Sequence, residues 1–348
     1  MKLRMTGSHR SIRTALVAVA GAAALVLSAC GSSADTGNDA ATGPLSSSST
    51  ETPAATSSEP PASSQSAEPP TDSSDAPSTS AGSATDPKSL LPADLAAKGT
   101  IIVGSNIEYP PFEMYAEDNT TVLGLDRDVA DGLEKQLGVT LEFQNAAFDA
   151  LIPGLVSGRY DMAMSAMTDT EEREKQVDFV DYVKAGGGIM VPADNPHSVA
   201  TADDLCGLQV AIVKGTTEVD DADYQSKKCV EDGKKELASA IYPGNNQMIL
   251  ALQTGRADVA LIDSVSGNQI ASESGGKLTM LPPYNESFFG IVFPKGSDQL
   301  QKAIQVALQA MAADGSYHAI FEKYGLGDAT VQEFTINGAI TSSGGLGS

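Results

Sequence analysis

Apolar and amphipathic stretches alternate along the chain from about residue 99 to residue 324. The first half predicts buried strands at 99–105, 139–143 and 161–165, separated by helices at 125–137 and 148–155. The first helix ends at a glycine, and the second has apolar residues at i, i+3, i+4 and i+7. A strand–helix–strand rhythm of this kind predicts a mainly parallel sheet with helices on its faces.

The same rhythm restarts after an apolar strand predicted at 186–192. The later elements are expected to be a short helix at 203–205, strands at 209–213, 240–242, 259–262 and 288–293 with helices between the first three, and closing helices at 300–312 and 317–324. This order favours a second lobe inserted into the first, with two chain crossings whose Gly-rich and extended segments permit hinge closure. We expect lobe 1 at 89–190 plus 285–339, lobe 2 at 191–284 and a tail at 340–348.

Two segments that start 97 residues apart, at Leu151 and Met248, follow one template. Each ends an apolar-faced helix with the sequence Gly-Arg-x-Asp and continues into a short buried strand. In open α/β sheets, ligands bind outside the carboxyl ends of the strands. Unless the likeness is a coincidence, the residues after these two strands, Ser165 to Thr168 and Asp263, are expected to face a cleft.

Residues 1–29 have the composition of a secretion signal. Four basic residues and no acid precede an apolar run of 13 residues, Ala15 to Leu27, which is shorter than the roughly 20 residues of a membrane span. The residues from Leu27 to Cys30 resemble the lipobox of bacterial lipoproteins, and this resemblance implies a lipid on Cys30. An ordinary signal peptide that ends near an unrelated cysteine is the alternative.

A low-complexity segment follows at 30–88. It consists almost entirely of Ser, Thr, Ala, Gly, Pro and acidic residues, with no aromatic residue, so it cannot bury enough apolar surface to offset its ordering entropy. We predict a disordered tether that holds an extracytoplasmic body above the cell membrane that carries the lipid. Such a stalk favours a Gram-positive type of envelope.

The remaining cysteines, Cys206 and Cys229, lie in a chain that is predicted to be exported, and disulfides persist outside the cytoplasm. A bridge between them would close a loop of about 24 residues, which stabilises a fold by on the order of 3 kcal/mol. Two free thiols are the alternative.

Charge and histidine content exclude two kinds of partner. The formal net charge of −23 repels phosphate backbones, so nucleic acid is not expected as a partner. Apart from the leader, the chain contains only His197 and His318, which are far apart and lack the spacing of metal ligands. We therefore expect no metal site.

Five motifs occur in the order found in one protein family. They are Glu108-Tyr-Pro-Pro-Phe112, Gly124-Leu-Asp-Arg-Asp128, Ala147-Phe-Asp-Ala-Leu-Ile-Pro153, Met167-Thr-Asp-Thr-Glu-Glu-Arg173 and Val177-Asp-Phe179. Together they resemble the family 3 extracellular solute-binding proteins over residues 99–327. The resemblance implies an α/β, periplasmic-binding-protein type II fold, with two α/β lobes joined by a two-crossing hinge. It also implies a polar amino acid receptor of an ABC importer, which delivers its ligand to permease subunits. We expect a monomer without a cofactor.

Arg173 is the first candidate for ligand contact. Thr168 or Thr170 can cap a short helix here, and the two glutamates that follow suit its dipole, whereas a cation in the first turn opposes it. A guanidinium matches a carboxylate bidentately. By resemblance, Arg173 grips the α-carboxylate of the ligand, with help from the Ala166 backbone N–H and the Thr168 hydroxyl. A surface arginine paired with nearby acids is the alternative.

Five further residues match ligand-binding positions of the family. Thr216 and Thr217 follow a strand and open a helix, whose free N–H groups form an anion site, although a plain turn and cap would look the same. Asp263 ends an apolar strand, where burial of an acid is costly without a cation or donors, and by resemblance it accepts the α-ammonium. Tyr109 and Phe148 match the aromatic positions that hold the side chain; ordinary core packing is the alternative.

The side-chain pocket is less well defined by the sequence. Ser165 and Asn106 complete the candidate ligand contacts, and Asn106 stands where binders of basic amino acids often carry an acid. Glu108 or Glu113 could supply that charge instead. Near the motifs there is no further Arg or Lys that would favour an acidic ligand. Polar, neutral and basic amino acids therefore all remain possible ligands.

Two other classes of function are alternatives to an amino acid receptor. The fold also occurs in dehydratases and cell-wall hydrolase-like modules, but no Gly-x-Ser-x-Gly, His-Glu-x-x-His or P-loop motif occurs, and the spacing of Ser274 and Lys277 lies in a glycine turn. A ligand-sensing or structural surface lipoprotein without a transport role is the other alternative. We expect a binding protein and not an enzyme.

Overall fold

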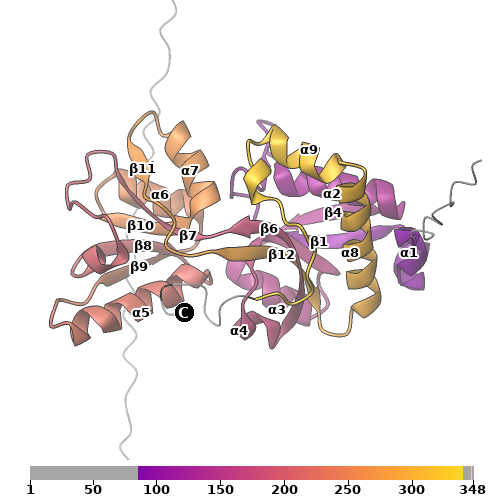
Figure 1. The fold of residues 1–348 in the computed structure, drawn as a ribbon, viewed down its shortest axis with the longest axis horizontal. Coiled ribbons are helices and arrows are strands. Elements are labelled where there is room, and N and C mark those ends of the chain that lie inside the picture. The colour runs from indigo at the N-terminus through magenta and orange to yellow at the C-terminus, as the bar shows by residue number, and fades with distance from the viewer. Residues whose placement is uncertain (1–84, 340–345, 347–348) are drawn as a thin grey trace, which may run out of the picture. The chain divides into compact units, whose positions relative to one another are not determined.

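The structure, a computed structural model, describes residues 85–339 and residue 346 (Figure 1). The predicted signal peptide, the lipidated Cys30, nearly all of the predicted tether and most of the predicted tail lie outside the described residues. No helix within the described ranges is long and apolar enough to span a bilayer.

Two five-stranded sheets form the centres of two lobes (Figure 1). The first sheet has the order β4 (Thr140–Asn145), β1 (Thr100–Ser105), β5 (Met162–Thr168), β12 (Ser287–Pro294), β6 (Val177–Ala185). The second has the order β11 (Leu278–Met280), β7 (Gly187–Pro192), β10 (Val259–Asp263), β8 (Gln209–Val213), β9 (Ala238–Tyr242). A small hairpin pairs β2 (Met114–Tyr115) with β3 (Val122–Leu123).

Helices cover both faces of each sheet. In the first lobe they are α1 (Ala93–Lys98), α2 (Leu125–Leu137), α3 (Leu151–Val156), α4 (Glu171–Glu174), α8 (Asp298–Ala313) and α9 (Ser316–Lys323). In the second lobe they are α5 (Thr217–Glu231), α6 (Asn245–Gln253) and α7 (Ser264–Glu273). Short 3₁₀ turns occur at Pro87–Leu90, Phe148–Ala150, Ala202–Leu205 and Gly327–Ala329.

Alternating side chains place each strand between two cores. Along β5, Met162 and Met164 join the core under α2 and α8, whereas Ala163 joins the core under α3. Along β8, Val210 and Ala211 divide in the same way between the α5 and α6 sides. Because both faces are covered, these strands are apolar throughout, as the sequence pattern predicted.

Helix α2 illustrates how the pattern becomes packing. Leu125, Val129, Leu133 and Leu137 are fully buried, one turn apart on one face, and burial of each side chain contributes about 1.5–3 kcal/mol. The helix ends at Gly138, which adopts a left-handed φ of 69° and donates its N–H to Glu134. The predicted stop is therefore confirmed.

One strand in each sheet runs against the other four. In the first sheet it is β12, which is antiparallel to both β5 and β6. In the second sheet it is β7, which is antiparallel to β10 and β11. Both are the first strand after the chain has crossed from the other lobe, so the mainly parallel sheets that were predicted are interrupted where the crossings enter.

The two crossings lie side by side. Gly187 donates its N–H to Asn285 Oδ1 at 2.5 Å and accepts the Tyr284 N–H at 2.9 Å. A Cβ atom at Gly186 would lie 2.3 Å from the backbone oxygen of Asn285, so a side chain at this position would separate the crossings. Close contact of the two connecting segments explains why the crossing is glycine-rich.

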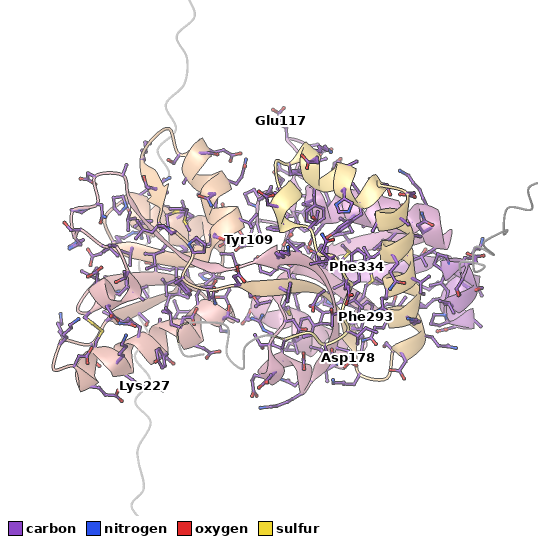
Figure 2. All side chains as sticks on the ribbon, viewed as in Figure 1. Tyr109, Glu117, Asp178, Lys227, Phe293 and Phe334 are labelled. Atoms are coloured by element: carbon purple, nitrogen blue, oxygen red, sulfur yellow. A yellow bond between two sulfur atoms is a disulfide. The ribbon has the colours of Figure 1, made fainter. Side chains whose placement is uncertain are left out.

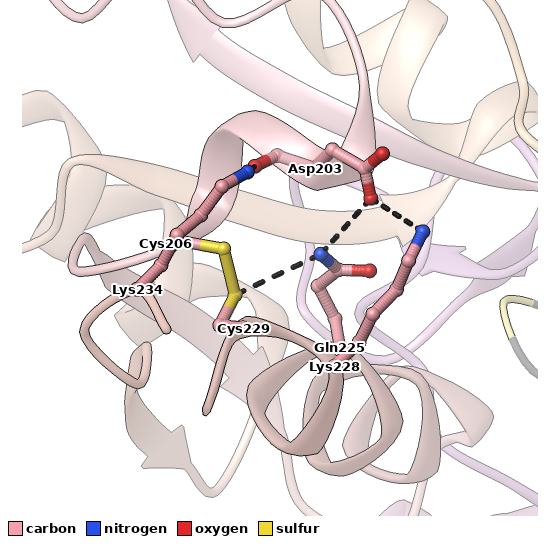
Figure 3. Close-up of a disulfide and its surroundings, with 6 residues drawn as sticks. All are labelled: Asp203, Cys206, Gln225, Lys228, Cys229 and Lys234. Atoms are coloured by element: carbon pink, nitrogen blue, oxygen red, sulfur yellow. Dashed lines mark hydrogen bonds and ion pairs between the residues drawn. A yellow bond between two sulfur atoms is a disulfide. The ribbon is translucent and has the colours of Figure 1, made fainter. Parts of the chain in front are cut away.

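The predicted disulfide between Cys206 and Cys229 is confirmed. It joins the residue after the 3₁₀ turn at Ala202–Leu205 to the last turns of α5, with 5.5 Å between the two Cα atoms (Figure 3). Lys228 on α5 donates to Asp203 Oδ1 at 2.7 Å on the same side. These contacts hold the C-terminal end of α5 against the segment from Ala202 to Cys206 of the same lobe.

Candidate functional site

One cavity brings together the ten candidate ligand contacts that the sequence analysis assigned. From the first lobe these are Asn106, Tyr109, Phe148, Ser165, Ala166, Thr168 and Arg173, and from the second Thr216, Thr217 and Asp263. Six more residues complete its lining: Glu113, Val213, Glu218, Asn245, Leu261 and Ile262. The cavity therefore has walls from both lobes.

The carboxyl ends of parallel strands build this cavity. Asn106 follows β1, Thr168 ends β5, Thr216 follows β8, and Asp263 is the last residue of β10. The two copies of the repeated segment supply β5 and β10. Their strand ends meet at the cavity, as expected for open α/β sheets.

Arg173 is held at the boundary between the lobes. Thr170, not Thr168, caps α4, and its Oγ1 accepts the Arg173 N–H at 3.2 Å. The guanidinium donates through Nη1 to Thr168 O at 2.7 Å and through Nη2 to Gly215 O of the second lobe at 3.0 Å. It lies over the Phe148 ring, 5.7 Å from the centroid.

The guanidinium of Arg173 has no carboxylate partner within salt-bridge distance among the described residues. Burial lowers the pKa of Arg173, and the charges of Glu218 and Asp263 oppose that shift. The paired surface arginine that was the alternative is therefore absent, and a half-buried cation faces the cavity.

Backbone irregularity marks the end of β5. Three of its residues, Met164 to Ala166, lie opposite the single residue Ile291 of β12. Ala166 adopts a φ of 44°, which is strained for a residue with a side chain. Burial raises the pKa of Asp126 to about 7, and the Ala166 N–H beside this carboxyl opposes that shift. A ligand would therefore compete with Asp126 for this donor.

Asp263 faces the cavity from the second lobe and contacts the first. It is 9% exposed, and its Oδ2 accepts the Tyr109 hydroxyl at 2.7 Å. Burial, and then the charge of Glu218, raise the pKa of Asp263 well above its usual value, while Tyr109 and Arg173 lower it. Figure 2 shows Tyr109 where the two lobes meet.

The start of α5 offers donors to the cavity. Thr216 is the residue before the helix, and its hydroxyl donates to Val213 O at 3.0 Å and caps no helix N–H. Thr217 is buried, and its side chain has no hydrogen-bond partner among the described residues. The first N–H groups of α5 and the Thr217 hydroxyl are thus suited to an anion.

Ser165 has a positioning role in this arrangement. Its hydroxyl donates to Glu113 Oε1 at 2.8 Å and accepts the Asn106 N–H at 2.9 Å, while Asn106 Nδ2 donates to Ala146 O. Burial and the neighbouring Asp126 raise the pKa of Glu113 well above its usual value. A buried acid pair thus lies directly beneath the first-lobe wall.

Glu108, the other acid considered for the side-chain pocket, is not part of the cavity lining. Its Oε2 accepts Asn246 Nδ2 of the second lobe at 3.1 Å. Lys214 and Asp149 form a second contact between lobes, at 2.8 Å, and the Ser266 hydroxyl donates to Pro110 O at 2.5 Å. These three pairs join the two lobes directly.

Five of the six additional lining residues were not identified from the sequence. Asn245 begins α6 directly after β9, and Glu218 is the second residue of α5. Both occupy positions after strand ends, which is the signal that could have revealed them. Val213, Leu261 and Ile262 belong to strands, and their apolar character gave no indication of a cavity.

A second buried acid pair adjoins the site. Asp169 follows Thr168 directly, and Asp181 lies on β6; both are 1% exposed, and none of their four carboxyl oxygens has a hydrogen-bond partner among the described residues. Burial, followed by the neighbouring acid charges, raises the pKa of Asp169 to about 9, and burial raises that of Asp181 to about 7. Within residues 85–339, no group of three or more metal-binding side chains is suitably placed for an ion.

Known proteins similar to this chain bind amino acids. The sequence model of the bacterial extracellular solute-binding proteins, family 3, matches residues 101–327. The arginine-binding protein ArgT of Corynebacterium glutamicum is 29% identical over 252 residues, which cover 72% of this chain and 82% of the relative. The putative ABC transporter arginine-binding protein 2 of Escherichia coli is 31% identical over 234 residues, which cover 66% of this chain and 91% of the relative.

Solved structures agree with these relatives. The ancestral amino acid-binding protein AncCDT-1, a precursor of cyclohexadienyl dehydratase, has a TM-score of 0.60 at 30% identity, over 66% of this chain and 97% of its own. An ancestral arginine-binding protein bound to glutamine also has a TM-score of 0.60 at 30% identity, over 66% and 98%. The predicted periplasmic-binding-protein type II fold is confirmed, and the chain belongs to the bacterial extracellular solute-binding proteins, family 3.

Proposed function

We propose that this protein is the extracytoplasmic receptor of an ABC importer, which captures an amino acid by hinge closure and delivers it to the membrane permease. One observation carries the proposal: Arg173 from the first lobe and Asp263 from the second line the same cavity with opposite charges. An α-amino acid carries the complementary pair of charges on one carbon.

The α-carboxylate is assigned to the Arg173 side of the cavity. A guanidinium has five N–H donors, and that of Arg173 makes only two hydrogen bonds to the part of the chain that the structure describes, to Thr168 O and Gly215 O. The Thr168 and Thr217 hydroxyls and the first N–H groups of α5 add donors from both lobes. A carboxylate held there would be bonded by both walls at once.

The α-ammonium is assigned to Asp263. A buried carboxylate gains most from a cation at hydrogen-bond distance, because burial otherwise favours its neutral form. Tyr109 donates to the same carboxylate and thereby fixes its orientation. Tyr109 and Phe148 then flank the space for the ligand's remaining atoms.

Closure follows from the distribution of these groups. Each lobe alone supplies one of the two charges, so a zwitterion gains both partners only when the lobes meet. The paired crossings at Gly187 and Asn285 are the natural hinge. Relatives named as arginine-, cystine- and histidine-binding proteins support an amino acid as ligand. The extracellular character of the family supports the extracytoplasmic location, to which we add a lipid anchor on this chain.

A thermal-shift screen tests this function. The twenty amino acids, each at millimolar concentration, are compared with deaminated and decarboxylated analogues of the best binder. We expect at least one amino acid to raise the melting temperature and both analogues to lose most of that shift. Stabilisation by no amino acid would refute the receptor assignment, and consumption of the bound amino acid would contradict a binding protein in favour of an enzyme.

A further inference from the structure

Glu218 is a buried acid that the amino acid clamp does not use. It is 3% exposed and lines the cavity, and its side chain makes no hydrogen bond or ion pair with any described residue. Its charge acts on Arg173, Asp263 and Tyr109, which places it among the groups assigned to the ligand. A carboxylate that lines a cavity and has no protein partner gains from a cation at hydrogen-bond distance, so a ligand group is the natural partner for Glu218.

The charges of the cavity do not balance for a simple zwitterion. Among the described lining residues Arg173 is the single cation, against the acids Asp263, Glu218 and Glu113. Glu113 is engaged by Ser165 and paired with Asp126 beneath the wall. Once a zwitterion has matched Arg173 and Asp263, Glu218 is left as a buried negative charge.

Helix stability alone does not require this acid to be buried. Acids in the first turn of a helix are stabilised by its dipole, but the gain is available to an exposed side chain as well. Asp220 lies in the same first turn and is exposed, whereas Glu218 is directed into the cavity lining. The burial of Glu218 therefore calls for a second explanation.

We infer that Glu218 pairs with a second positive charge on the ligand, so that this site selects amino acids with a cationic side chain. The inference rests on the proposed function and names its substrate class. Arginine, lysine and ornithine fit the charge balance. An acidic amino acid would place a second anion beside Glu218 and Asp263, and a neutral one would leave Glu218 uncompensated.

Calorimetric titration with a matched ligand pair tests the inference. Arginine and citrulline have nearly the same shape, but citrulline has a neutral ureido group in place of the guanidinium. We expect the unmodified protein to bind arginine about 30-fold or more tightly than citrulline, in line with the loss of one buried charge pair. Lysine and ornithine should also bind more tightly than glutamine.

The variant Glu218→Gln keeps the side-chain shape and removes the charge. It should lower the affinity for arginine strongly while the affinity for citrulline changes by no more than about threefold, so that the preference for the cationic ligand largely disappears. Glu231→Gln is the control, because it removes the same charge from an exposed position at the other end of α5. Melting curves show that each variant is folded.

Failure of the Glu218 inference and failure of the proposed receptor function give different results. Equal weakening of arginine and citrulline by Glu218→Gln would mean that Glu218 binds the α-ammonium common to both, and it would overturn the inference. Equal affinity of the unmodified protein for both ligands would also overturn it, even if the variant did not fold. Binding of no amino acid at all would instead refute the receptor function.

Discussion

Replacement of Arg173 tests the carboxylate clamp most directly. Arg173→Ala removes the only cation in the described cavity lining and leaves a ligand carboxylate with neutral donors. Truncation of one partner in a buried, hydrogen-bonded charge pair costs about 2–5 kcal/mol, which corresponds to a roughly 30-fold to several thousand-fold loss of affinity. We therefore expect binding of every amino acid to fall by at least the lower limit.

The same structure predicts a small effect on folding. Of the two residues whose carbonyl groups accept from Arg173, Gly215 is exposed and Thr168 lines the cavity, so water can replace the lost donors when the lobes open. Removal of the arginine also removes the desolvation cost of a half-buried charge. A change of about 1 kcal/mol shifts the melting temperature by roughly 2–4 °C in a protein of 150–250 residues, and we expect a shift of that order.

Two further variants separate charge from geometry. Arg173→Lys keeps a cation but lacks the guanidinium fork, so its affinity should fall between those of the unmodified protein and Arg173→Ala. Arg159→Ala removes an exposed arginine that lies over the Tyr160 ring, away from the cavity lining. Isothermal titration calorimetry measures all four proteins. Unchanged affinity in Arg173→Ala, or an equal loss in Arg159→Ala, would refute the clamp.

Three other predictions concern charge, covalent structure and pH. Asp263→Asn should lower the affinity for amino acids several-fold more than the affinity for their deaminated analogues in competition titrations, and equal losses of affinity would contradict an ammonium contact. The double variant Cys206→Ser/Cys229→Ser should lower the free energy of unfolding by on the order of 3 kcal/mol in chemical denaturation, without change in ligand affinity. Because Asp169 and Asp181 have raised pKa values, the folded state keeps protons that the unfolded chain loses, so the free energy of unfolding should fall as pH rises from about 4 to about 9. Asp169→Asn should reduce that fall. A pH profile of stability identical to that of the unmodified protein would count against the pair.

Secondary structure followed the sequence pattern wherever one face of an element had a clear apolar stripe. Helix α2 and strand β8 have the predicted bounds because their apolar positions repeat with the period of each element. Helix α7 was not predicted, because its ten residues include serines, an asparagine and Gly267, which are poor helix formers. Tertiary packing explains the glycine: a Cβ atom there would lie 2.5 Å from Met280 Sδ.

Some residues of the site could be identified from the sequence pattern, and others only from the packing of the elements. Arg173 could be identified because a cation in the first turn of a helix conflicts with local stability, and a conflict of that kind indicates function. Glu218 could not, because an acid in the first turn agrees with local stability and resembles the exposed Asp220 in sequence. Only the packing of α5 against the cavity distinguishes the two acids.

The repeated segment connects these findings. In both copies the aspartate performs the same task, since Asp161 Oδ2 accepts the N–H of Ile102 and Asp258 Oδ2 accepts the N–H of Gln209, at 2.7 and 2.8 Å. Each thereby joins the start of its own strand to the neighbouring parallel strand, which explains why an aspartate stands at this position in both copies. The shared aspartate is thus structural, and the residues that differ at the opposite ends of the two strands carry the proposed chemistry. A common framework positions a cation on one lobe and an acid on the other, and ligand selection depends on the positions where the copies diverge.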